Sequence, residues 1–175
     1  MTETGPANFD LESSLEWIRK QNFRKAKTLP TEATLKTLRR MVASSNTRVR
    51  GAALRALRFI CGISPPQGIE MINRLRIHLL ITRSLEREAR FFEERMQALK
   101  LIRTMAGFSP ERIPRTLVRS LVSIAVHRDD QLKEAALESL REYSLLNTRA
   151  VAECGGITAM VNSILDPTAL DTSFF

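Results

Sequence analysis

The chain is poor in the residues that build disulfide frameworks and metal sites. It has two cysteines and two histidines among its 175 residues. Cys61 and Cys154 lie 93 positions apart, and neither belongs to a Cys-x-x-Cys pair or to a Cys/His cluster. This usage argues against a disulfide scaffold and a zinc site, and it indicates a reducing, intracellular compartment. We therefore expect neither a metal site nor a cofactor.

Long apolar runs are missing as well. No stretch approaches the ~18 residues that a membrane-spanning helix needs. The first residues, MTETGPANFDLESS, lack a basic region followed by an apolar core, so we expect no secretory signal. Hydrophobic residues make up 43% of the chain and charged residues 26%, which is typical of a globular domain rather than of a disordered segment.

Glycine and proline are scarce, at seven each, and they fall between segments of helical periodicity. Valine and isoleucine do not collect into the alternating runs that indicate strands, so the pattern predicts an all-α protein. Proline suits the first turn of a helix, and Ser, Thr, Asn or Asp can cap it. The predicted helix starts are Pro30-Thr31, Asn46-Thr47, Pro65-Pro66, Ser109-Pro110, Pro114 and Asp129-Asp130. Gly155-Gly156 is expected to end a short helix.

Three blocks of the sequence repeat one arrangement of apolar residues. The blocks are AALRALRFI at residues 52–60, QALKLIRTM at 97–105 and AALESLREY at 135–143. The corresponding leucines, Leu54, Leu99 and Leu137, are separated by 45 and 38 residues, close to the ~40–47 of HEAT and armadillo repeats. The fold class that we expect is an armadillo/HEAT-like, right-handed α-solenoid of about three to four helical repeats.

The same punctuation divides the chain into segments. A first helix is expected at about residues 9–24, within an N-terminal segment 1–30. Armadillo-like helical repeats are expected at 31–165, and a flexible tail at 166–175. Residues 1–8 are likewise expected to be mobile or poorly packed, because chain ends often are.

The same sequence signals predict two details of the later repeats. The middle unit should take its first helix from residues 66–85, and EREARFFEE should form a longer connection after it. Asp129-Asp130 should cap a helix at residues 131–146 and face the positive end of its dipole.

The stretch VRGAALRALRFIC, residues 49–61, holds several arginines within one of the blocks. At about 100° per residue its apolar residues fall on one face of a helix, whereas Arg48, Arg55 and Arg58 fall together on the other. Arg50 falls toward the apolar side. We expect its long stem to reach solvent from the first turn of the helix.

Positive charge is unevenly distributed over the sequence, whose net charge is +8. The net charges by segment are −4 for residues 1–16, +11 for 17–58, +3 for 59–107 and −2 for 108–175. Such asymmetry indicates an acidic partner, an anionic surface or nucleic acid near residues 17–58. The candidate partner-binding basic face comprises Arg39, Arg40, Arg48, Arg55 and Arg58.

Four segments also carry a family resemblance: VRGAALRALRFI, ERMQALKLIRTM, IPRTLVRSLVSIA and AVAECGGITAMVNSIL. In this order and spacing, together with INRLRIHLLITRSLE, they resemble the N-terminal armadillo region of the Rictor family, also called Pianissimo. The resemblance covers about residues 31–165. It does not extend to residues 1–30 or to the tail DPTALDTSFF. The arginine-rich style suggests a fungal member, and the great length of family members would make this chain an N-terminal fragment.

The resemblance implies a scaffold without catalytic activity. Members of that family are subunits of the second target-of-rapamycin (TOR) kinase complex, where they help hold together the TOR kinase and the stress-activated-kinase-interacting subunit. The complex phosphorylates AGC-family kinases at the membrane. The expected partners are therefore subunits of that complex, and the expected place is the cytoplasm, with a peripheral position at the plasma membrane. The resemblance assigns a role to no single residue.

Other function classes fit the sequence less well than a scaffold does. His127-Arg128-Asp129 is similar to a kinase catalytic loop, but Glu134 stands where such a loop needs asparagine, and no glycine-rich loop exists. The chain is thus expected not to be an enzyme. The same basic face could instead bind nucleic acid or an anionic membrane surface. Aromatic residues make up 6% of the chain, which disfavours a stacking platform for nucleic acid and leaves weak membrane contact as an accessory role.

Overall fold

The computed structural model describes residues 5, 6 and 8–166, and within them the chain forms ten α-helices, two short 3₁₀ helices and no strand. In chain order the elements are α1 (Leu11–Gln21), α2 (Glu32–Val42), α3 (Thr47–Ile63), α4 (Pro65–Arg74), α5 (Ile77–Leu85), η1 (Ala89–Phe91), α6 (Phe92–Phe108), η2 (Pro110–Arg112), α7 (Arg115–Val126), α8 (Lys133–Leu146), α9 (Thr148–Glu153) and α10 (Gly156–Leu165). The predicted mobility of residues 1–8 and 166–175 falls mostly on positions outside those that are described.

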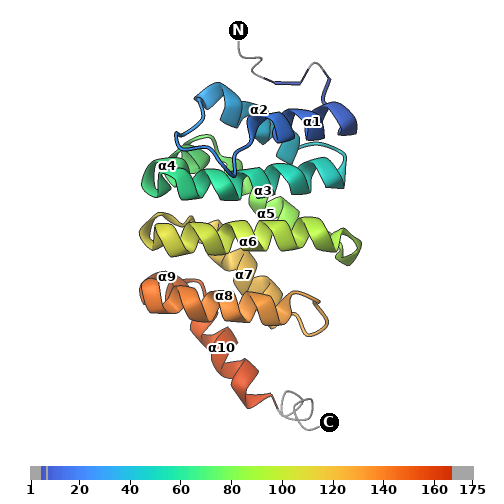
Figure 1. Cartoon of the computed structure of the whole chain (residues 1–175). Helices are drawn as coiled ribbons and strands as arrows, with labels where there is room; N and C mark the ends of the chain where they lie inside the picture. Colours follow the sequence, from blue (N-terminus) through green and yellow to red (C-terminus); the bar gives the residue numbers. More distant parts are fainter. Residues whose placement is uncertain (1–4, 7, 167–175) are drawn as a thin grey trace.

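The helices are arranged as a stack. Helices α3, α6 and α8 lie one above the other on one side, and α5 and α7 cross behind them (Figure 1). Each of these three helices contains one copy of the repeated block. The prediction of an all-α, helical-repeat fold is confirmed.

The core lies between successive repeats. The equivalent leucines Leu54, Leu99 and Leu137 are all buried, as are the residues three positions later in each block, Leu57, Ile102 and Leu140. Because a helix pair cannot cover its own apolar face, each repeat is stabilised by the next one along the stack.

Local signals explain where several helices begin. The Asn46 side chain accepts hydrogen bonds from the backbone N–H groups of Arg48 and Val49 at the start of α3. Thr31 caps α2 in the same way, and Pro65 opens α4. Gly155, at φ 80°, ends the short helix α9 and admits the turn into α10. These predicted boundaries are confirmed.

The predicted single helix at residues 66–85 is wrong. The chain forms α4 and α5 instead, broken at Arg76, which adopts a left-handed conformation with φ 56°. The break lets Ile72 of α4 and Ile77 of α5 both reach the core, where neither is exposed. The connection after it is also shorter than predicted, because α6 begins at Phe92.

Two further boundaries differ from the prediction. Helix α8 begins at Lys133, because Asp130 caps the preceding turn through the backbone N–H of Leu132, at 2.8 Å. The first helix is limited to α1, which Asp10 caps and Asn22 ends in a left-handed conformation. Trp17 anchors α1 in the core and lies edge-on to Phe23, with 6.2 Å between the ring centroids.

None of the helices in the described ranges combines the length and apolar character required to cross a bilayer.

The stacking of repeats predicts that a charge in the shared core unfolds the protein. Leu57→Asp should lower the free energy of unfolding by at least about 4 kcal/mol, because Leu57 is fully buried and a carboxylate there has no partner. Thermal unfolding followed by circular dichroism measures the loss. Leu145→Asp is the matched control, since Leu145 is 87% exposed. A wild-type melting curve for Leu57→Asp would contradict the repeat register.

Candidate functional site

The five arginines of the predicted basic face fall into two groups. Arg48 and Arg55 are exposed on α3 and line one hollow together. Arg58 is half-buried one turn later on the same helix. Arg39 and Arg40 lie in the last turn of α2 and do not line that hollow. Of the five arginines, only Arg48 and Arg55 thus share this hollow.

Arg40 has a contact of its own. Its guanidinium lies over the ring of Phe9, 4.0 Å from the centroid, which is a cation–π contact between α2 and the residue just before the first helix. Arg39 is exposed.

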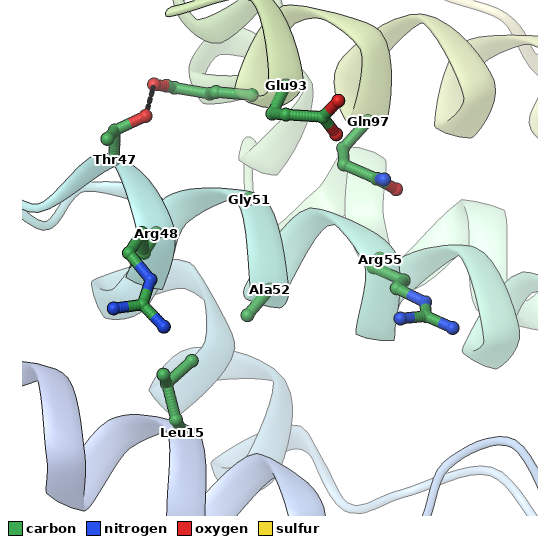
Figure 2. Close-up of a pocket in the computed structure, with 9 residues that line it drawn as sticks. Leu15, Thr47, Arg48, Gly51, Ala52, Arg55, Glu93 and Gln97 are labelled. Carbon is green, nitrogen blue, oxygen red and sulfur yellow. Dashed lines mark hydrogen bonds between the residues drawn. The ribbon is translucent and has the colours of Figure 1, made fainter.

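A furrow runs between α1 and α3. Three adjoining hollows of about 310, 670 and 400 Å³ share Leu15. Arg48 lines the first two, and Ala52 and Arg55 line the first and third. We call this depression the α1–α3 furrow. In Figure 2, Leu15 on α1 faces Arg48 on α3, and Glu93 and Gln97 project from α6 on the opposite side.

Apolar residues form the floor of the furrow. Helix α1 contributes Leu15 and Ile18, and α3 contributes Ala52, Ala56 and Phe59. The spacing of these residues is three or four positions on each helix, so each set lies on one helix face. The furrow therefore has two facing apolar stripes, one on each wall.

Charged residues of both signs line the furrow, namely Arg19, Arg24, Arg48 and Arg55, and Asp10, Glu12, Glu16, Glu93 and Glu94. The guanidiniums of Arg55 and Arg58 lie 5.7 and 5.6 Å from the centroid of the Phe59 ring. Partial burial, and then the charge of Arg55, lower the pKa of Arg58. The second cause shows that positive charge accumulates at this end of α3. Arg19 is paired with Glu16 on α1.

Arg50 does not reach solvent, and that prediction is wrong. It is 2% exposed, and its Nε and Nη2 atoms each donate to a carboxylate oxygen of Glu94 on α6, both at 2.7 Å. A third donor, Nη1, binds the carbonyl of Ser44 at 2.9 Å. A helical wheel placed Arg50 correctly toward the interior, but it could not show that a carboxylate from the next repeat lies there.

Glu94 is the centre of a buried network. Besides Arg50 it accepts hydrogen bonds from Ser84 at 2.8 Å and Thr47 at 2.9 Å. Arg87 Nε lies 2.8 Å from Oε1 of Glu94, as an ion pair rather than an aligned hydrogen bond. Burial alone would raise the pKa of Glu94, but the hydrogen bonds from Arg50, Ser84 and Thr47 and the charge of Arg50 outweigh it and lower the pKa.

The next interface in the stack has a corresponding pair. Arg95 stands four positions before Leu99, as Arg50 does before Leu54. It is 3% exposed and binds Asp130 Oδ2 at 2.6 Å and the carbonyl of Leu85 at 3.0 Å. Bidentate or doubly bonded arginine contacts of this kind are directional. They fix how one repeat sits on the next.

Exposed ion pairs add to this pattern. They join residues 38 to 42 positions apart, which is about one repeat: Glu32–Arg74, Glu70–Arg112, Arg103–Glu142 and Arg115–Glu153. Exposed pairs contribute little each. Sequence reasoning missed them, although acid–base pairs at the repeat period were a usable signal.

The network and the furrow are connected. Thr47 and Glu94 belong to the network and also line the hollow of the furrow next to α6. Figure 2 shows Thr47 at one end of this hollow. The position of α3 between α1 and α6 therefore sets the shape of the furrow.

In the described part of the chain no cluster of three or more His, Cys, Asp or Glu could hold a metal ion. Burial raises the pKa of the Cys61 thiol to about 12, which leaves it unreactive.

Comparison with known proteins shows what the chain is similar to. Residues 13–173 match the family described as "Rapamycin-insensitive companion of mTOR, N-term". The chain is 36% identical over 132 residues to "Protein pianissimo A" of Dictyostelium discoideum, over 75% of this chain and 11% of that protein. It is 27% identical over 132 residues to the human "Rapamycin-insensitive companion of mTOR", over 74% of this chain and 8% of that protein.

A fungal relative is also similar. "Target of rapamycin complex 2 subunit TSC11" of Saccharomyces cerevisiae is 24% identical over 157 residues, which is 90% of this chain and 11% of that protein. The chain thus spans about a tenth of the length of these relatives. A fungal origin stays a prediction, since the relatives come from an amoeba and a mammal as well as a yeast.

The Glu94 network predicts a specific loss of stability. Glu94→Gln leaves the buried Arg50 and the half-buried Arg87 without their shared counter-charge, which should cost about 3–5 kcal/mol of unfolding free energy. Chemical denaturation at neutral pH measures it. Glu93→Gln is the matched control, because Glu93 is exposed beside it. Equal stability of the two variants would contradict the role given to Glu94.

The pH dependence follows from the lowered pKa. The contribution of Glu94 is fully present above the unfolded-state pKa of about 4.3 and is lost as the pH falls through the lower folded-state pKa. Glu94→Gln should therefore flatten the fall of stability below about pH 4.3. An acid titration of the unfolding free energy checks this against Glu93→Gln.

Proposed function

Because this chain belongs to the family of the N-terminal region of rapamycin-insensitive companion of mTOR, we propose that it is a non-catalytic scaffold module of the second TOR complex. The observation that carries the proposal is the family match over most of the chain, joined to a stack of repeats held together by buried ion pairs. A rigid stack with an extended surface is suited to hold other proteins in fixed positions.

The proposed partners follow from the family. They are the TOR kinase and the other subunits of the complex, including the stress-activated-kinase-interacting subunit, and the assembled complex acts on AGC-family kinases. The yeast relative, a "Target of rapamycin complex 2 subunit", supports this assignment. We propose a cytoplasmic complex with a peripheral position at the plasma membrane.

We propose a separate role for each part of the chain. Residues 31–165 form the repeat module, and residues 1–30 add one helix to its end. The basic face of Arg39, Arg40, Arg48, Arg55 and Arg58 is proposed to contact an acidic segment of a partner subunit. What supports it is the +11 charge of residues 17–58 and the exposure of four of these five side chains.

Co-purification of TOR complex subunits with the tagged protein tests the proposal. Reversing Arg39, Arg40, Arg55 and Arg58 to Glu should reduce recovery of the subunits by about tenfold. The four glutamates would repel the acidic partner segment that the arginines attract. The matched control reverses four exposed arginines elsewhere, namely Arg83, Arg119, Arg128 and Arg141.

The same experiment separates the alternatives when it is run at low and high salt. Retention of the subunits at high salt indicates apolar docking, since exposed charge pairs are screened. Recovery of no TOR complex subunit, with nucleic acid or anionic vesicles bound at low salt only, would overturn the scaffold proposal in favour of a basic adaptor.

A further inference from the structure

We propose that the α1–α3 furrow is a docking site for an acidic, amphipathic helix of a partner. This inference deepens the proposed scaffold function and rests on it, because it names the chemistry of one contact that the scaffold makes. Three features of the furrow support this occupant: its shape, its apolar floor and the arginines at its Phe59 end.

The shape of the furrow fits a helix. Its walls are the helices α1 and α3, whose apolar stripes face each other across the depression. The wall formed by α1 has 11 residues, which corresponds to a length of about 16 Å, or three helical turns. A short amphipathic helix presents anchors at positions i, i+3, i+4 and i+7, and these fit a groove of this length.

The floor admits close approach of a helix backbone. Ala52 and Ala56 are small α3 residues that line the hollow next to α1, together with Arg55 and Phe59. Their methyl groups leave room above α3, whereas Leu15, Ile18 and Phe59 supply larger half-buried apolar surface at the sides. An occupant with leucine-type anchors would cover surface that is now partly exposed to water.

Charge at the Phe59 end of the furrow favours an acidic occupant. The hollow of about 400 Å³ at the Phe59 end is lined by Arg19, Arg24 and Arg55 and by no carboxylate. Toward the other end, Arg48 stands opposite Leu15, and carboxylates line both hollows that Arg48 lines: Asp10, Glu12 and Glu16 in one, and Glu93 and Glu94 in the other. The occupant should therefore place its carboxylates near Arg24 and Arg55, at the Phe59 end.

The concave form argues for a helix over a membrane surface. The arginines stand on both sides of a depression whose apolar residues lie at its floor, so a flat bilayer would meet the charges without reaching Leu15 or Ala52. Binding of a membrane therefore becomes an outcome that the experiment distinguishes.

The test uses synthetic peptides of about three to four helical turns and the purified chain. The first peptide has a leucine stripe at helical spacing and glutamates on its flanks. In the second peptide the glutamates are replaced by lysines, and in the third the leucines are scattered around the helix. Fluorescence anisotropy should show binding of the first peptide, with the other two at least about tenfold weaker.

Variants of the furrow test the location. Ala52→Glu and Arg55→Glu should each weaken the first peptide by about tenfold, because one fills the floor with a charge and the other reverses a rim charge. Ala152→Glu and Arg141→Glu, at exposed helical positions outside the furrow, are the matched controls and should bind as the unmodified chain does. Circular dichroism confirms that all four variants are folded.

Three results would each overturn the inference. The first is equal binding of the three peptides, and the second is unchanged binding by Ala52→Glu and Arg55→Glu. The third is displacement of the first peptide by phosphatidylserine vesicles while Ala52→Glu leaves vesicle binding intact, which would make the arginines a membrane contact.

A second measurement identifies the occupant in the assembled complex. A photo-crosslinking residue at Ala52 should react with an acidic, amphipathic segment of another subunit, and mass spectrometry should locate it. Recovery of the TOR complex without any crosslink at Ala52 would overturn the furrow site and leave the scaffold function intact. Failure to recover the complex at all bears on the scaffold function instead.

Discussion

The contact between the Arg50 guanidinium and the Glu94 carboxylate is the constraint on which the rest of the structure depends. Both side chains are almost completely buried, and they come from neighbouring repeats, α3 and α6. Neither charge could remain there without the other, because an isolated buried ion is strongly destabilising. Four hydrogen bonds from Thr47, Ser84 and Arg50 and an ion pair with Arg87 converge on this one carboxylate. Sliding α6 along α3 would break the bonds from Thr47 and Arg50, so they favour a single register of α6 on α3.

The repetition of this device extends that constraint through the stack. Arg95 and Asp130 form a second buried pair at the next interface, and exposed pairs bridge successive repeats along the surface. Apolar burial supplies most of the stability but is tolerant of sliding, whereas paired charges are directional. The result is a surface whose hollows keep their shape. The furrow between α1 and α3 inherits that shape, because its α3 wall is fixed by the buried network.

Much of this could be read from the sequence, and the failures have clear causes. The period of Leu54, Leu99 and Leu137 located the three stacked helices, because burial of one face repeats with the structure. The break at Arg76 could not be predicted, since neither glycine nor proline marks it and only tertiary packing of the flanking helices requires it. Arg50 was misassigned because a helical wheel describes one helix, and Glu94 lies 44 residues away. The furrow depends on where α1 packs, and no repeat pattern includes α1.

A double-mutant cycle on Arg50 and Glu94 tests most directly whether the pair sets the register of the stack. The variants are Arg50→Met, Glu94→Leu and the two together, each measured by chemical unfolding. The account predicts that each single change is more destabilising than the pair of changes, with a coupling energy of at least about 2 kcal/mol. Additivity of the two single effects within about 0.5 kcal/mol would contradict it.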